Sequence, residues 1–189
     1  MAQLAMAFDY ELCINCRACE VACKEENGIL RGADKHRLWI EVKENGGDFY
    51  SLCQNKEEFL PRQCQECSDA FCEAVCPVDA IYHDKNGVVI TKADECILCN
   101  KCIEACPYNA RYVDEKRKFV DKCIFCSDTR LARGETTTAC QATCPAKVRY
   151  FGDIDDEKSE ISQILKEREY FQFPTGNNGV HLYYLKPLK

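Results

Sequence analysis

The sequence predicts an α+β protein built from several copies of one small unit, and three observations lead to this prediction. All 17 cysteines except Cys53 fall into four groups of four, which we call quartets one to four. After the last cysteine of quartets two, three and four the chain repeats one pattern, reading "CPVDAIY", "CPYNARY" and "CPAKVRY". Two of these repeats run on into pairs of strand-like segments, which favours β-hairpins and one supersecondary unit used several times. The quartets are Cys13, Cys16, Cys19 and Cys23; Cys64, Cys67, Cys72 and Cys76; Cys96, Cys99, Cys102 and Cys106; and Cys123, Cys126, Cys140 and Cys144.

Residues 27–62, between quartets one and two, contain no cysteine of any quartet, so cluster binding does not explain this segment. We predict a β-rich insertion here, because Trp39 lies in the strand-like run "RLWIEV". Cys53, in "DFYSLCQN", is interpreted as a small buried residue of another strand and not as a ligand.

The repeats are expected to continue past each Cys-Pro pair with a helical turn and then a strand. The run "HDKNGVVI" contains Asn86-Gly87, which predicts the turn of a hairpin. The run "RYVDEKRKFV" indicates the same hairpin with a longer, charged turn. A final helix is predicted over 155–168, and its apolar face consists of Ile161, Ile164 and Leu165.

The cysteine content fits either a disulfide scaffold or a metal carrier, since 17 cysteines in 189 residues is about 9 per cent. A disulfide scaffold implies export. The start "MAQLAMAFDYELC" lacks the basic and apolar regions of a secretory signal, so we expect the chain to have none of its own. The odd cysteine count and the short repeated spacings also disfavour disulfides.

Several other functional classes of protein are disfavoured by the net charge and by the lack of their sequence motifs. No run of about 18 apolar residues predicts a membrane span, and a net charge of −6 disfavours nucleic acid as a partner. The glycines never form the phosphate-binding turns GxGxxG or GxxxxGK[ST]. No arrangement of serine, histidine and carboxylate suggests hydrolysis, so no catalytic residue is predicted. Electron transport remains as the expected function.

The cysteine spacing favours iron–sulfur clusters over zinc. A structural zinc site takes two CxxC knuckles separated by about 12 to 20 residues. The run CxxCxxC instead places three thiolates on one short loop, which suits three corners of a [4Fe–4S] cubane, and in bacterial ferredoxins the next cysteine ligates the other cluster. A proline follows Cys76, Cys106 and Cys144, where it ends the ligand run, whereas Lys24 follows Cys23.

The four quartets follow the spacings CxxCxxCxxxC, CxxCxxxxCxxxCP, CxxCxxCxxxCP and CxxC(x13)CxxxCP. In this order they resemble the electron-transfer subunits of the molybdopterin oxidoreductases of the dimethyl-sulfoxide reductase family. The run "DKCIFCSDTRLARGETTTACQATCP", followed by "FGD", is especially similar to the subunits of polysulfide, thiosulfate and tetrathionate reductases. The resemblance covers nearly the whole chain.

The resemblance implies two ferredoxin-like halves related by pseudo-symmetry. The first half is expected to comprise residues 1–26 and 111–150, and the second half residues 63–110. The β-rich insertion at 27–62 and a C-terminal docking extension at 151–189 complete the expected fold. A plain structural role for these two segments is the alternative to docking.

The resemblance also implies four [4Fe–4S] clusters, with quartet one paired with quartet four and quartet two with quartet three. The shorter gap between Cys76 and Cys96 than between Cys23 and Cys64 favours the same nesting. Local pairing, one with two and three with four, stays open from the residues alone. The implied ligand sets are Cys13, Cys16, Cys19 and Cys144; Cys23, Cys123, Cys126 and Cys140; Cys64, Cys67, Cys72 and Cys106; and Cys76, Cys96, Cys99 and Cys102. Electrons are expected to pass through the first, second, fourth and third of these sets in turn.

The implied partners are a catalytic subunit with a molybdenum or tungsten bis-pterin and, at the other end, a quinol-oxidising membrane subunit or a soluble donor. The chain itself would be a non-catalytic subunit, in the cytoplasm or, if a twin-arginine peptide on the catalytic partner exports both, in the periplasm. A free polyferredoxin that shuttles electrons between enzymes is the alternative function.

Nearby charges predict which cluster is hardest to reduce. Four acidic residues lie near quartet two, and they predict the most negative potential for the cluster of Cys64, Cys67 and Cys72. Three basic residues close to quartet three predict easier reduction there. The acidic residues are Glu66, Asp69, Glu73 and Asp79, and the basic residues are Lys92, Lys101 and Arg111.

Overall fold

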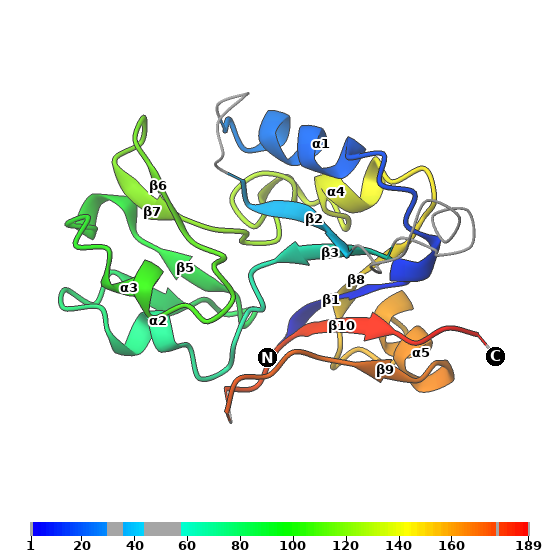
Figure 1. Cartoon of the computed structure of the whole chain (residues 1–189). Coiled ribbons are helices and arrows are strands. Elements are labelled where there is room, and N and C mark those ends of the chain that lie inside the picture. Colours follow the sequence, from blue (N-terminus) through cyan, green and yellow to red (C-terminus); the bar gives the residue numbers. More distant parts are fainter. Residues whose placement is uncertain (1, 30–35, 44–57, 177, 189) are drawn as a thin grey trace.

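The computed structural model describes residues 2–29, 36–43, 58–176 and 178–188, and its helices and strands agree with the predicted α+β class. Figure 1 shows two lobes. Residues 64–121, which we call the hairpin lobe, contain short helices and two β-hairpins. The other described residues form what we call the sheet lobe.

The sheet lobe is organised by four strands in the order β8-β1-β10-β9. The strand β1 is parallel to β10 and antiparallel to β8. Because side chains alternate along a strand, Met6 and Phe8 join the main apolar core while Ala5 and Ala7 face a second, smaller one. The four strands are β1 (Leu4–Phe8), β8 (Arg149–Asp153), β9 (Tyr170–Phe171) and β10 (Leu182–Leu185).

The helix α5 (Glu160–Glu167) packs on the face of the sheet that carries the two small alanines. The Ser159 hydroxyl caps its first turn by accepting a hydrogen bond from the Ser162 amide at 3.1 Å. The predicted apolar face is confirmed, because Ile161 is fully buried and Ile164 and Leu165 pack beside it. The helix is shorter than predicted, since turns that Asp153 and Asp156 close occupy the residues before it.

The C-terminal extension, for which a docking role stays a prediction, supplies a central strand of the sheet. The strand β10 lies between β1 and β9, and Leu182 and Tyr184 are fully buried. The Tyr184 hydroxyl also donates a hydrogen bond to the Pro61 carbonyl at 2.9 Å. The extension therefore helps to form the core of the sheet lobe.

The insertion contributes the hairpin of β2 (Leu38–Lys43) and β3 (Glu58–Gln63), so the predicted strand around Trp39 is confirmed. Cys53 lies outside the described residues. The helices α1 (Ala18–Glu26) and α4 (Ala139–Ala142) pack against each other beside this hairpin and carry cysteines of quartets one and four.

The hairpin lobe contains both predicted hairpins, β4 (Ile81–His83) with β5 (Val89–Thr91) and β6 (Tyr112–Asp114) with β7 (Phe119–Asp121). The Asp84 carboxylate closes the first turn by accepting hydrogen bonds from two backbone amides.

The helical turn of each repeat precedes the Cys-Pro pair, whereas the sequence predicted that it would follow this pair. These turns are α2 (Phe71–Ala74) and α3 (Lys101–Glu104), and short 3-10 helices occupy Tyr10–Leu12 (η1), Ala93–Glu95 (η3) and Leu131–Arg133 (η4).

The β6–β7 hairpin packs on the hairpin lobe, whereas the sequence placed residues 111–150 with the first half. Val113 and Val120 share an apolar cluster with Ile81 and Val89. The equivalent strand after quartet four, β8, pairs with β1 instead. The three strands differ in the strand with which they pair. The strands β4 and β6 each pair with the next strand of their own hairpin, whereas β8 pairs with β1 from the start of the chain.

Candidate metal centres

The backbone of the cysteine loops repeats an uncommon conformation. A non-glycine residue at positive φ costs about 1–3 kcal/mol and persists where its surroundings impose it, often at functional sites. Turns of this kind also direct successive backbone N–H groups to one side, which suits a negatively charged group. Directly before the second cysteine of every quartet lies a residue with φ between 46° and 56°: Asn15, Glu66, Leu98 and Phe125. A second set lies three residues after the last cysteine of quartets two to four: Asp79, Asn109 and Lys147.

The cysteines gather in sets that each draw on two quartets. Three cavities are each lined by four cysteines, two of them at contacts between distant parts of the chain. In the fourth set Cys67 lies near Cys72 and Cys106 and packs in the same apolar cluster as Cys64. We name the sets site I (Cys13, Cys16, Cys19, Cys144), site II (Cys23, Cys123, Cys126, Cys140), site III (Cys64, Cys67, Cys72, Cys106) and site IV (Cys76, Cys96, Cys99, Cys102).

None of these sixteen cysteines, all within the described residues, forms a disulfide. Within the described residues no group of three or more His, Cys, Asp or Glu side chains is arranged to hold a single metal ion. In sites I, II and IV the four thiols line one cavity, and this arrangement suits a group with several metal atoms, such as a cubane.

Burial raises the pKa of several thiols, especially in sites II and III. Desolvation raises the pKa of Cys23, Cys64 and Cys123 far above that of a free thiol. Desolvation, followed by the charge of Cys72, raises the pKa of Cys67 to about 12. Four thiolates can therefore share one site only if positive charge offsets the cost of their burial and repulsion. The iron of a bound cluster would supply such charge, and buried basic residues would add to it.

Arg149 lies beside site I and is only 3% exposed. Its guanidinium stacks over the Phe8 ring at 4.9 Å, and Nη1 donates to the Gln63 amide oxygen at 3.4 Å. Among the described residues its Nη2 has no hydrogen-bond partner, and the nearby anionic groups are cysteines, Cys140 and Cys19 first. A buried cation with an unsatisfied donor fits a negatively charged cluster in site I.

Arg37 lies beside site II, but a carboxylate offsets its charge. It donates two hydrogen bonds of 2.9 Å to Asp121 and one of 2.7 Å to Asn27. Asn27 in turn donates to Cys23 Sγ at 3.6 Å. Asp121 also accepts hydrogen bonds from Arg117 and from the Tyr112 hydroxyl. The pair is thus fixed in orientation behind the cluster site.

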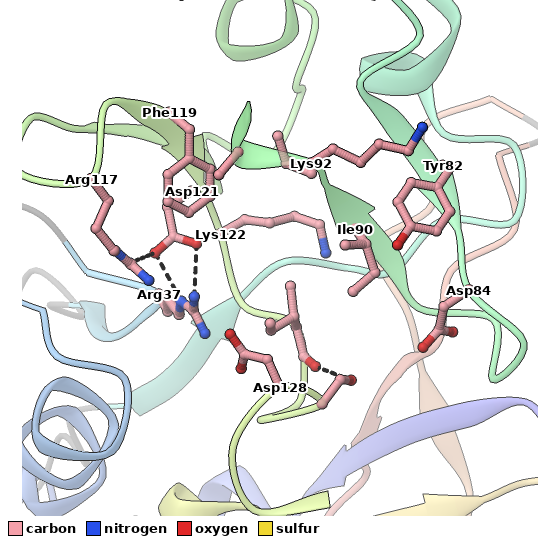
Figure 2. A pocket seen from close by; sticks show the side chains of 14 residues that line it. Arg37, Tyr82, Asp84, Ile90, Lys92, Arg117, Phe119, Asp121, Lys122 and Asp128 are labelled. Carbon is pink, nitrogen blue, oxygen red and sulfur yellow. Dashed lines mark hydrogen bonds and ion pairs between the residues drawn. The ribbon is translucent and has the colours of Figure 1, made fainter. Parts of the chain in front are cut away.

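A cavity of about 690 Å³ lies on the far side of this network, between loop 122–128 and strands of the hairpin lobe. Figure 2 shows Asp121 joined to Arg37 and Arg117 at one side of the cavity, with Tyr82 and Asp84 at the other. Its basic residues, including Lys92 on Glu95, are ion-paired within the described residues. The cavity is therefore not built to bind an anion.

Site III is flanked by two buried cations. Lys122 is 1% exposed and donates to Glu66 at 2.6 Å, so that their charges cancel. Arg111 donates from Nη2 to Cys72 Sγ at 3.0 Å and from Nη1 to the Thr91 hydroxyl at 3.1 Å.

Asn178, in the C-terminal extension, connects the sheet lobe to site III. Its amide donates to Cys67 Sγ at 3.2 Å and to the Tyr108 hydroxyl at 2.9 Å. The next residue, Gly179, has φ of +48°, and a Cβ there would lie 3.0 Å from the Ser68 hydroxyl. Glycine permits this close approach of the extension to the loop of Cys67.

Comparison with known proteins agrees with this chemistry. Residues 55–154 match a family model described as a 4Fe-4S dicluster domain. A polysulfide reductase protein of Wolinella succinogenes is 41% identical over 163 residues, which cover 86% of this chain and 83% of the relative. The chain belongs to the family of iron–sulfur electron-transfer subunits. The resemblance inferred from the quartets is thereby confirmed.

Other members of the family cover most of the chain as well. The thiosulfate reductase electron transfer subunit PhsB of Salmonella typhi is 37% identical over 182 residues, with 96% of this chain and 91% of the relative covered. A sulfite dehydrogenase subunit of Allochromatium vinosum is 34% identical over 191 residues, with 91% and 78% covered. Like these relatives, the chain is an electron-transfer subunit of the iron–sulfur type. Among its described residues, none of the helices has the length and apolar character needed to cross a membrane.

The charged residues that lie close to site III in the sequence are not the ones that determine the charge around it in the structure. Glu66 is neutralised by Lys122, and Glu73 pairs with His83 at 2.8 Å. Arg111, which the sequence assigned to quartet three, instead donates to Cys72 of quartet two. The sequence offered no signal for Asn178, Arg37 or Arg149 beyond residue type, because their contacts with cysteines depend on tertiary packing.

Proposed function

We propose that the chain carries four [4Fe–4S] clusters, one in each of sites I to IV, and conducts electrons between two partner proteins. The observation that carries the proposal is the nested grouping of the thiols, since three cavities are each lined by one complete predicted ligand set. Anaerobically purified protein should contain about 16 iron atoms per chain, four in each cluster. About 12 iron atoms, or a three-iron signal in fresh protein, would contradict this.

The nested pairing can be tested at Cys144, which lines the same cavity as Cys13, Cys16 and Cys19. Replacing Cys144→Ser should alter the spectrum of the site I cluster and leave site IV unchanged. Local pairing predicts the opposite result, a change in the cluster held by Cys96, Cys99 and Cys102.

We infer that electrons pass through the sites in the order I, II, III, IV. Sites I and II share α1, since Cys19 and Cys23 both lie on this helix. Lys122 donates hydrogen bonds to Glu66, which precedes Cys67, and to the Cys123 carbonyl, and these contacts support neighbouring positions for sites III and II. This order differs from the sequence-based order, which put site III at the end, because Cys64 is buried in the centre whereas Cys99 of site IV is exposed.

Partner proteins would then dock at the two outer sites. Ile14, beside site I, is 62% exposed and Ile97, beside site IV, is 59% exposed. The relatives are named as components of reductases of sulfur compounds. We infer that one partner is a molybdenum or tungsten bis-pterin subunit that reduces a sulfur compound, and that the other is a quinol-linked membrane subunit or a soluble donor.

Purification of the native complex tests the assignment of partners. Molybdenum or tungsten should co-purify with the chain, and the compartment should be that of the catalytic partner, either the cytoplasm or, after co-export, the periplasm. A monomer that carries its full iron content and no partner would instead indicate a free polyferredoxin.

The pseudo-symmetry of two halves is supported by the conformation of the loops. Quartets one and three have positive φ at equivalent positions, Asn15 and Arg17 in one and Leu98 and Asn100 in the other. We therefore propose two ferredoxin-like halves, with the boundary after residue 121 because the β6–β7 hairpin packs on the hairpin lobe.

A further inference from the structure

Arg111 differs from Arg37 and Lys122 in having no acidic partner among the described residues. It is 5% exposed, and its hydrogen bonds within the described residues go to a thiol, Cys72, and a hydroxyl, Thr91. The Arg37 guanidinium beside site II is paired with Asp121, and Lys122 is paired with Glu66. Site III is therefore next to a full, uncompensated positive charge.

The other charged groups around site III do not cancel this charge. Glu66 and Lys122 form a buried pair at 2.6 Å and together contribute no net charge. Glu73 is 38% exposed and pairs with His83, so water and that partner weaken its effect. Asp69 and Asp79 are exposed to solvent.

We propose that Arg111 raises the reduction potential of the cluster in site III. The inference rests on the proposed occupancy of that site. Reduction adds one electron, delivered by the neighbouring cluster, and no bond or proton is exchanged. The reduced cluster carries one more negative charge than the oxidised cluster, and a buried cation at hydrogen-bond distance stabilises that extra charge. This charge acts against the sequence-based expectation that site III is the hardest to reduce.

A pair of variants at Thr91 tests the proposal with Arg111 left in place. Thr91→Asp gives the guanidinium a carboxylate partner, as Asp121 does for Arg37, whereas Thr91→Asn is a neutral control of similar size. In a potentiometric titration of the anaerobic protein monitored by electron paramagnetic resonance, Thr91→Asp should make reduction of the site III cluster about tenfold less favourable, a shift of about 59 mV. Thr91→Asn should leave the midpoint potential close to that of the parent protein.

Direct replacement of the arginine provides the second measurement. Arg111→Gln should lower the same midpoint by at least as much, and Arg111→Lys should restore most of it because the charge is kept. Arg133→Gln removes an equal charge from a half-exposed side chain paired with Glu26 and Glu135, and it should shift no cluster.

The site III signal is assigned by its change in Cys72→Ser. If four clusters are present and Thr91→Asp behaves as Thr91→Asn, or Arg111→Lys as Arg111→Gln, the role of Arg111 is wrong and the proposed function stands. If the parent protein lacks a cluster that responds to Cys72→Ser, the proposed function itself fails.

Discussion

Sites II and III differ from sites I and IV in their contact with water. Cys64 and Cys123 are buried at the centre of the molecule, where Glu66 and Lys122 form an ion pair between them. Sites I and IV each have an exposed cysteine, Cys16 and Cys99. In the proposed wire the inner pair would exchange electrons with neighbouring sites and would depend on buried polar groups, whereas the outer pair would face partner proteins.

The largest expected difference is between ligand losses at an inner and an outer site. Cys123→Ser removes a buried ligand that connects loop 122–128 to α1 through site II, and because cluster binding and folding are coupled, we expect the chain to lose most of its iron and folded yield. Cys16→Ser should alter the site I cluster alone. Iron content and circular dichroism of both variants measure this, and equal losses would show that the inner sites have no special structural role.

The ion pair behind site II should matter more than an ion pair on the surface. Asp121→Asn leaves the buried Arg37 without its carboxylate, and we expect a loss of about 3–5 kcal/mol in the free energy of unfolding. Glu169→Gln breaks the exposed pair with Lys186 and should cost about 0–1 kcal/mol. Anaerobic denaturant titrations compare the two, and similar costs would remove the distinction between inner and outer charges.

Asn178 tests whether the C-terminal extension stabilises an inner site. Asn178→Ala leaves the Tyr108 hydroxyl and Cys67 Sγ without their donor, and we expect a cost of about 1–3 kcal/mol. Gln163→Ala, on the exposed face of α5, should cost less than about 0.5 kcal/mol. The free energies of unfolding of both variants measure this, and a neutral Asn178→Ala would show that the extension does not support site III.

The smallest expected effect is a pH dependence at His181. Burial lowers the pKa of His181, so below about pH 6.5 the unfolded chain binds more protons than the folded chain. Stability should therefore fall as the pH drops from about 6.5 toward the folded-state pKa, by no more than about 1.4 kcal/mol per pH unit. His181→Gln should reduce this slope in unfolding titrations, and an unchanged slope would assign it to other groups.

The elements that could be predicted from the sequence depend on short stretches of chain. The CxxCxxC loops, the turn at Asn86-Gly87 and the apolar face of α5 are each determined by neighbouring residues, because turn geometry and side-chain periodicity are local properties. The iron–sulfur chemistry follows from the same local spacing. The position of the helical turns before the Cys-Pro pairs was wrong, since the pattern after the proline gave no information about the residues in front of it.

The sequence alone determined that sixteen cysteines in four quartets support cluster chemistry and electron transfer. Only the tertiary structure decided that β10 lies in the centre of the sheet, that Arg111 reaches Cys72 and that site III lies inside the molecule. The physical reason is that burial and Coulomb interactions depend on distance through space. Residues such as Arg111 and Cys72, 39 positions apart, become partners only when the chain has folded.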